Sequence, residues 1–288
     1  MISIVIPTIR ENCIKNFLEK WNFKDVQVIV VEDNPTKTFK ISGVEHYSWK
    51  EIDKELGRNS WIISRRNSAI RAYGFLKAYQ AGADIIITLD DDCTPETPNL
   101  VETYKKALEK KVPISWMSTT EGLYPRGFPY NIREEAEVML HMGLWKGVPD
   151  LDGPTQLINP NENYEPTIVN QIVPKGIYFP LCSMNFGFRK EIISEMLPPL
   201  NGKDQPYDRF DDIWLGIYIK RYLDKKGYAA TFGEPYVNHK RASDVFSNIK
   251  KEAPGLEVNE TLWMEDVNTS YFKRYKEALK IWRSLFPQ

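Results

Sequence analysis

The sequence predicts an α/β fold in which a mostly parallel, twisted sheet is flanked by helices, with a loop-rich second half. The runs at 26–31 and 85–89 are nearly continuously apolar and rich in β-branched residues, as strands are when both faces of a parallel sheet are covered. Between such runs lie segments whose apolar residues recur with the period of an amphipathic helix. Alternating strands and helices favour parallel strands joined by right-handed crossovers.

The individual elements follow from the same two patterns. In the first third of the chain, we expect strands at 3–6, 26–31, 85–89 and 114–117. We expect helices over 67–79, 100–108 and 14–21, where Ile14, Phe17, Leu18 and Trp21 share one face. Late helices are expected over 213–222 and 271–285, where the apolar stripes are typical of packing against a core.

The stretch from 124 to 180 has a different character, because clusters of Pro, Gly and Asn replace the periodic runs. Such clusters predict loops. Within this stretch, Asn131 and Glu134 have the spacing of a capping box, in which a helix's first residue and the residue three positions later bond to each other's backbone. The pattern predicts a helix that begins here with Arg133 in its first turn.

Composition and charge exclude several classes of function. The chain has 288 residues, of which 42% are hydrophobic and 27% charged, so it can bury a core without disulfides. With 38 basic and 39 acidic residues, nothing global draws it to a nucleic acid or a membrane, and we expect neither as a partner. The motifs of zinc proteases, serine hydrolases, P-loop proteins and NAD-binding folds are absent, so no NAD cofactor is expected.

Cysteine usage and the amino end indicate the compartment. The three cysteines, Cys13, Cys93 and Cys182, are far apart and form no CxxC pair, which is typical of a reducing environment. The only apolar run at the amino end is stopped by Pro7, so it is too short for a signal peptide or a membrane span. We therefore expect a cytoplasmic protein.

Three adjacent carboxylates, Asp90, Asp91 and Asp92, directly follow the strand at 85–89. They repel one another, so their burial at a strand end requires a cation or hydrogen-bond donors. Ligands of open parallel sheets bind beyond the carboxyl ends of the strands, and hard oxygen ligands favour Mg²⁺ or Mn²⁺, which would bridge a nucleotide's diphosphate. The alternative is that one aspartate caps a turn, aided by Thr94 and Pro95, while the others are solvated.

A second acidic pair, Asp211 and Asp212, opens the helix expected at 213–222. The helix dipole explains one carboxylate at this position but not two. The other could serve as a general base or hold a sugar hydroxyl. Asp150 and Asp152 have a similar spacing, but they lie in a Pro- and Gly-containing loop where turn formation is the simpler interpretation.

Several stretches, in order, resemble the reversibly glycosylated polypeptides, also called UDP-arabinopyranose mutases. They are TLDDDC at 88–93, RGFPYNIRE at 126–134, PDLDGPTQL at 149–157 and RFDDIW at 209–214, with further similarity at 239–243 and 248–252. The resemblance implies a GT-A-type fold and the interconversion of pyranose and furanose nucleotide sugars with Mn²⁺ or Mg²⁺ and without flavin. A UDP-arabinose-like substrate is favoured over a GDP-sugar, and the alternative activity is a glycosyltransferase, including one that glycosylates itself.

The resemblance also divides the chain and implies roles by position. A single domain would comprise a nucleotide-binding half at 1–120, a metal- and sugar-binding half at 121–252 and a helical end at 253–288. Metal would be held by Asp90, Asp92 and His239, although a lone histidine commonly makes only ordinary hydrogen bonds. The substrate residues would be Pro7, Thr8 and Asp33 for the nucleoside, Asp91 for the diphosphate, Arg66 and Arg71 for phosphate, and Asn185 for the sugar. The sequence leaves open whether the protein forms a homo-oligomer.

The family's self-glycosylated arginine falls at Arg126, and a second functional arginine falls at Arg133. A guanidinium is a poor nucleophile at neutral pH unless a carboxylate takes its proton. It is well suited to clamping a departing diphosphate so that the diphosphate can return to the sugar. We therefore expect Arg126 in the catalytic centre, as nucleophile or clamp, and Arg133 in the substrate site. Asp211 and Asp212 are the other expected catalytic residues.

Overall fold

The computed structural model describes residues 1–21, 23, 25–117, 120, 123–133, 135–160, 163–240, 243–264, 267 and 269–287. Its sheet runs in the order β3-β2-β1-β4-β9-β7-β10-β5, with β6 beside β7 and β8 beside β10. The strands are β1 Ile2–Thr8, β2 Gln27–Glu32, β3 Glu45–Tyr47, β4 Ile85–Leu89, β5 Cys93–Pro95, β6 Lys111–Val112, β7 Ala136–Gly147, β8 Asn170–Val173, β9 Asn185–Arg189 and β10 Ala229–His239.

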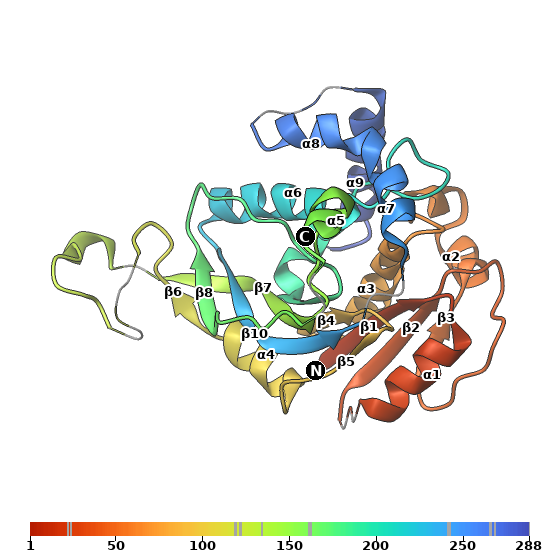
Figure 1. Cartoon of the computed structure of the whole chain (residues 1–288), viewed down its shortest axis with the longest axis horizontal. Coiled ribbons are helices and arrows are strands. Elements are labelled where there is room, and N and C mark those ends of the chain that lie inside the picture. Colours follow the sequence, from red (N-terminus) through yellow and green to blue (C-terminus); the bar gives the residue numbers. More distant parts are fainter. Residues whose placement is uncertain are drawn as a thin grey trace.

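The helices cover both faces of this sheet, as the sequence predicts (Figure 1). Helices α1 and α4 lie on one side, and α3, α6 and α9 lie on the other. The α-helices are α1 Glu11–Lys20, α2 Trp49–Leu56, α3 Arg71–Gln80, α4 Leu100–Leu108, α5 Gly153–Ile158, α6 Asp211–Lys226, α7 Val245–Glu252, α8 Leu256–Leu262 and α9 Ser270–Arg283. In the part of the chain described, no helix is both long and apolar enough to cross a membrane.

The predicted parallel sheet is confirmed for its first half and is mixed in the second. Strands β3, β2, β1 and β4 are parallel neighbours. Strand β9 is antiparallel to both β4 and β7, whereas β7 and β10 are parallel to each other. The pattern of apolar residues in β9 is the same for either direction of pairing, so sequence periodicity could not predict the reversal.

Two local predictions in the middle of the chain are wrong. The strand expected at 114–117 is only the short β6, Lys111–Val112, which ends two residues earlier. The helix expected after Asn131 is a single 3₁₀ turn over Tyr130–Ile132, and Arg133 follows it; Glu134 lies outside the described residues. The loop-rich stretch also contains the twelve-residue strand β7, whose nearly continuous burial leaves no alternation to detect.

The core is formed by the two faces of the sheet and the helices packed on them. Both late helices serve this packing, as expected. Trp214 of α6 and Trp282 of α9 are completely buried, and Phe272 of α9 packs against Trp214 with ring centroids 5.5 Å apart. The amino-terminal helix likewise buries Ile14 and Phe17. These contacts fix the starts of α3 and α6 beneath the carboxyl ends of the strands, where the predicted site lies.

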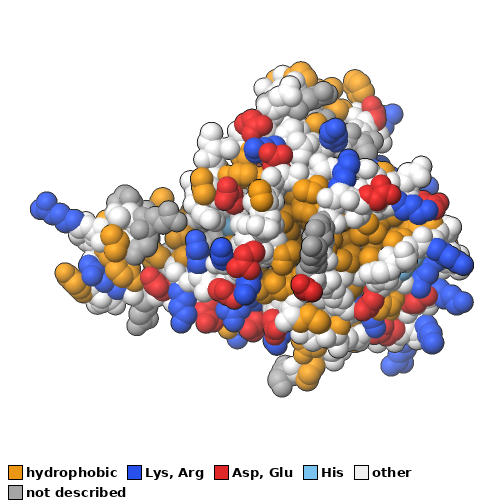
Figure 2. All heavy atoms as spheres, turned by 90° about the horizontal axis from the view of Figure 1, so that it is seen from below, with side chains coloured by type: hydrophobic (Ala, Val, Ile, Leu, Met, Phe, Trp, Pro, Cys, Tyr) orange, Lys and Arg blue, Asp and Glu red, His pale blue; other side chains and the backbone are white. Residues whose placement is uncertain are grey.

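One segment stands apart from the body. Between β6 and β7 the chain leaves the sheet and returns, forming a projection that we call the arm, defined by the described residues within 113–133. Figures 1 and 2 show the arm extending away from the rest of the molecule. On the face seen in Figure 2, basic and acidic side chains are interspersed, in agreement with the near-zero net charge.

Candidate functional site

The aspartate triplet lies at the end of β4, in the turn before β5, and Arg10 binds two of its members. Arg10 follows β1, and its guanidinium forms an ion pair with Asp91 through both Nε and Nη2 and lies 3.3 Å from Asp92. Thr8, the last residue of β1, donates its hydroxyl to Asp91 at 2.6 Å. Burial raises the pKa of Asp91 even so, because it outweighs the bonds from Arg10 and Thr8.

Arg71, at the start of α3, binds the third aspartate. Its Nη2 donates to Asp90 at 2.6 Å, Nη1 to the Thr88 hydroxyl and the Ser183 carbonyl, and Nε to the Ser68 carbonyl. Only 1% of its side chain is exposed. Each of its side-chain nitrogens donates to the protein, and the contact of Arg71 with substrate stays a prediction. Arg71 fixes the orientation of Asp90.

The second acidic pair lies next to the triplet, as the sequence predicts. Ser183 joins the two groups: its carbonyl accepts from Arg71, while its amide N–H donates to Asp212 at 2.8 Å. Asp211 is buried and accepts from the Asn67 side chain at 3.4 Å. The two acidic motifs, more than a hundred residues apart in the chain, are thus connected through one serine and one arginine.

The pKa values of Asp211 and Asp212 are both raised towards neutral pH. Burial raises the pKa of Asp211 to about 7, with the charge of Asp212 adding to the effect. Burial and then the charge of Asp150 raise the pKa of Asp212 to about 6. Two neighbouring carboxylates that protonate between pH 6 and 7 can give and take protons at physiological pH, which is the property required of a general acid and base.

Asp150 belongs to this group although its loop composition favoured a simple turn. Its charge also raises the pKa of Cys182, after the larger effect of burial. Asp152, by contrast, has the local role that the sequence predicts: it caps α5 by accepting from the Thr155 N–H at 3.0 Å. The cap of α5 needs only Asp152, the second aspartate of the DxD spacing. The first aspartate, Asp150, is left without a local role, and this was the signal that could have distinguished the two.

The predicted nucleoside residues lie at the ends of β1 and β2, beside the acidic group. Asp33 accepts from the Trp49 indole at 2.7 Å and from the Asn67 N–H at 2.8 Å, and burial raises its pKa. Its N–H donates to the carbonyl of Thr8, next to Pro7. Asn67 therefore connects Asp33 to Asp211 and, like Trp49, was missed by the sequence analysis.

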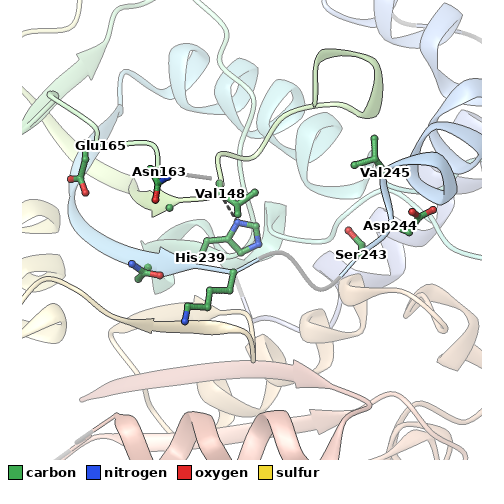
Figure 3. A pocket seen from close by; sticks show the side chains of 10 residues that line it. Val148, Asn163, Glu165, His239, Ser243, Asp244 and Val245 are labelled. Carbon is green, nitrogen blue, oxygen red and sulfur yellow. Dashed lines mark hydrogen bonds between the residues drawn. The ribbon is translucent and has the colours of Figure 1, made fainter. Parts of the chain in front are cut away.

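His239, at the end of β10, lines a pocket of about 680 Å³ (Figure 3). Its Nδ1 lies 2.7 Å from the carbonyl of Val148, which requires Nδ1 to carry the proton and leaves the Nε2 lone pair available. His239 also lies close enough for its charge to lower the pKa of Asp92, although burial and the charge of Asp90 raise that pKa overall. The other pocket residues are Gly147, Asn163, Glu165, Asn238, Lys240, Ser243, Asp244 and Val245.

The chemistry of these donors fits a hard divalent cation, but their arrangement is not yet that of a metal site. Within the described residues, no three His, Cys, Asp or Glu side chains form a metal-binding group. The reason is visible in the ion pairs: Asp90 is directed at Arg71 and Asp91 at Arg10. Asp92 lies near enough to His239 for the histidine's charge to lower its pKa, and the Nδ1 contact leaves the Nε2 lone pair of His239 available.

The structure does not bring the two arm arginines to this group. Strand β10 pairs with β7 so that His239 lies opposite Gly147, while Ala229 lies opposite Val138 at the other end. The arm joins β7 at that other end, about 35 Å away at ~3.3 Å per residue. Arg126 is exposed there, and Arg133 stacks on Tyr130, 3.8 Å from the ring centre. The catalytic role expected for Arg126 and the substrate role expected for Arg133 stay predictions.

Two further predicted substrate residues, Asn185 and Arg66, have partners within the protein, and their roles stay predictions. Asn185 is completely buried: its side-chain amide donates to the carbonyls of Leu144 and Pro235 and accepts from Tyr104. Its polar atoms are therefore bonded within the protein. Arg66 is exposed and pairs with Asp204 at 3.2 Å, with both side chains at least half exposed, so nothing aims it at the site.

Comparison with known proteins identifies the family of this chain. A solved structure of CMP:2-keto-3-deoxy-manno-octonic acid synthetase with CTP has a TM-score of 0.40 and 13% identity, covering 90% of this chain and 99% of that one. UDP-arabinopyranose mutase 1 of Oryza sativa subsp. japonica is 34% identical, covering 92% of this chain and 76% of the relative. UDP-arabinopyranose mutase 1 of Arabidopsis thaliana is 35% identical, covering 97% and 82%. A family model described as reversibly glycosylated polypeptide matches residues 1–276, and the chain therefore belongs to that family.

Proposed function

We propose that this protein is a nucleotide-sugar mutase that interconverts the pyranose and furanose forms of a UDP-arabinose-like sugar. The observation that carries the proposal is the pair Asp211 and Asp212, which is connected to the triplet through Ser183 and Arg71 and whose pKa values are raised by burial. Relatives that match over most of the chain are named UDP-arabinopyranose mutases, which supports the same activity.

The reaction would need little beyond proton transfer and retention of the leaving group. The bond between the anomeric carbon and the diphosphate breaks, the ring opens and recloses through another hydroxyl, and the diphosphate returns. No atom is gained or lost and no oxidant is consumed, and the proposal includes neither flavin nor NAD. One carboxylate of the Asp211–Asp212 pair would take the proton from the hydroxyl that closes the new ring, and its protonated neighbour would supply one to the oxygen that leaves the old ring.

The proposal includes a divalent cation, Mn²⁺ or Mg²⁺. Asp90, Asp92 and the Nε2 of His239 would hold it, and when bound it would offset the negative charge of the departing diphosphate. The hydrogen bond from His239 Nδ1 to the Val148 carbonyl supports this assignment, because metal-binding histidines are commonly oriented in this way.

A product assay tests the proposed function. Incubation of the protein with UDP-arabinopyranose and Mn²⁺, followed by chromatography, should yield a second UDP-sugar of identical mass and no free UDP. Release of UDP together with a glycosylated acceptor, or with a glycosylated protein, would show the alternative transferase activity. Recovery of unchanged substrate from a screen of UDP- and GDP-sugars would contradict both.

The aspartate nearest His239 is predicted to be required for cation binding. Asp92→Asn should weaken Mn²⁺ binding at least about tenfold and remove the Mn²⁺ dependence of UDP binding, because an amide oxygen carries no net charge to offset the cation. Isothermal titration with Mn²⁺ alone and then with UDP measures both effects. Asp84→Asn is the matched control, because Asp84 is exposed and pairs with Lys190 outside the site. Equal Mn²⁺ affinity in wild type and Asp92→Asn would refute the assignment.

The compartment and assembly complete the proposal. All three cysteines are free thiols, and two of them are buried, which supports a reducing and hence cytoplasmic location. Homo-oligomer formation stays a prediction, to be checked by light scattering after size-exclusion chromatography.

A further inference from the structure

An ion pair that the proposed mechanism does not use lies beside the acidic pair. Arg209 is two residues before Asp211, and its Nε donates to Glu252 at 2.9 Å. The other carboxylate oxygen of Glu252 accepts from the Gly153 N–H at 2.8 Å. Glu252 is the last residue of α7 and only 7% of its side chain is exposed. The pair therefore joins three segments that are distant in sequence: the start of α5, the loop before α6 and the end of α7.

The backbone around this ion pair is strained, and neighbouring groups support it. Arg209 has a backbone φ of 67°, in the left-handed region that non-glycine residues rarely adopt. The carboxylate of Asp208 accepts from the Arg209 N–H at 3.0 Å, which stabilises that conformation. Gly153 permits the close approach on the other side, since a Cβ there would lie 2.4 Å from a side-chain carbon of Ile249. A strained backbone supported from several directions is typical of a functional position.

The exposed part of the Arg209 guanidinium can still bind a ligand. About 31% of the Arg209 side chain is exposed, and its Nε is bonded to Glu252. Within the described part of the chain, both terminal nitrogens remain available as a fork. Its chain neighbours Asp211 and Asp212 carry the proposed proton transfers, and Asp150, near Asp212, precedes Gly153 in the loop that Glu252 binds.

We propose that Arg209 binds the diphosphate of the nucleotide sugar and that Glu252 is a positioning residue that holds Arg209 in the required orientation. The proposal rests on the proposed function for the identity of the ligand. A planar guanidinium binds two phosphate oxygens at once, and anchoring its Nε to a carboxylate fixes the plane of the fork. Arg209 would also retain the diphosphate between its departure from the sugar and its return, near the carboxylates that move the protons.

The first test compares UDP with uridine as ligands. Arg209→Gln should weaken UDP binding at least about tenfold and leave uridine binding unchanged, whereas Arg209→Lys, which keeps the charge but not the fork, should fall between. Arg283→Gln is the matched control: Arg283, at the end of α9, also pairs with a glutamate, Glu195, through its Nε and one terminal nitrogen, and its removal should affect neither ligand. Thermal unfolding of each variant shows whether it is folded. Unchanged UDP affinity in Arg209→Gln would overturn the proposal.

A double-mutant cycle tests the role of Glu252. If Glu252 acts only by orienting Arg209, Glu252→Gln should weaken UDP binding several-fold in the wild type and have no effect in the Arg209→Gln background. Additive losses would show that Glu252 acts independently, and would overturn the positioning role. Failure is distinguishable from failure of the proposed function: a wild-type protein that isomerises its substrate while Arg209→Gln binds UDP normally refutes only this inference. If Arg209→Gln loses UDP binding and the wild type isomerises no sugar, only the proposed mutase activity is refuted.

Discussion

Replacement of Asp212 with asparagine is expected to slow turnover by about 10²–10⁴-fold, the usual contribution of a general acid or base. The Ser183 N–H can still donate to the amide oxygen of asparagine, so the loop should keep its conformation. Steady-state kinetics with the UDP-sugar substrate measure the effect. Asp152→Asn is the control, because Asp152 only caps α5 and asparagine is an equally good cap. Full activity of Asp212→Asn would remove this pair from the mechanism.

The pH dependence provides a second readout of the same pair. The mechanism needs one carboxylate and one protonated carboxyl in this pair. With pKa values of about 6 for Asp212 and about 7 for Asp211, wild-type activity should therefore pass through a maximum between about pH 6 and 7 and fall on either side. Asp212→Asn removes a neighbouring negative charge, so the pKa of Asp211 should fall and the midpoint of any residual activity should shift to lower pH.

The stability of the protein should fall as pH rises through the same range. Because these pKa values are raised above the ordinary value of 3.8, the folded chain binds more protons than the unfolded chain between about pH 4 and 7, and its stability falls as pH rises through that window. Asp212→Asn removes one of these charges. The variant should therefore gain in unfolding temperature relative to the wild type at pH 8 and gain less at pH 5. A stabilised but inactive variant is the pattern expected of a functional residue.

Replacement of Arg71 with glutamine is expected to lower the free energy of unfolding by about 3–5 kcal/mol, the range seen when one partner of a buried ion pair is removed. Asp90 would lose its cation, and the carbonyl of Ser183 and the hydroxyl of Thr88 would lose a charged donor. Urea unfolding measures the loss. Arg66→Gln is the control, because its ion pair with Asp204 is exposed and such pairs contribute less than about 1 kcal/mol.

The same variant should also lose activity, because Arg71 and Ser183 connect the triplet to the Asp211–Asp212 pair. If Arg71→Gln were as stable as Arg66→Gln, the buried ion pair between Arg71 and Asp90 would contribute no more to stability than the exposed pair of Arg66. Retention of wild-type turnover by a destabilised Arg71→Gln would instead separate the stability of the site from its chemistry.

Much of the site could be predicted because strand ends are easy to find. The buried run at 85–89 predicts where Asp90 lies, and parallel pairing brings the ends of β1 and β2, with Thr8 and Asp33, to the same edge. The expectation that Asp211 belongs to the same site came from the resemblance of its motif to the family. The period of the apolar residues did not predict it. These predictions depend on backbone position alone, which a pattern of apolar residues encodes well.

The remaining site residues could not be predicted, because their roles depend on what surrounds a side chain. Arg71 and Arg66 are close in sequence, yet one is buried with every nitrogen bonded and the other is exposed. Asn185 has the residue type of a sugar ligand, but Tyr104 and two carbonyls use its polar atoms. Arg10 was missed because its partners are eighty residues away, across the sheet.

The antiparallel pairing of β6 with β7 makes the arm separable from the rest of the protein. Val112 lies directly opposite Ala136, so a tight two-residue turn such as Asn-Gly could join them and close a short hairpin. The sheet would keep every strand pair, and the intervening segment, Arg126 included, would be excised as a unit. The molecule thus offers a natural cut point at which the contribution of a whole insertion to catalysis can be measured without disturbing the carboxylates.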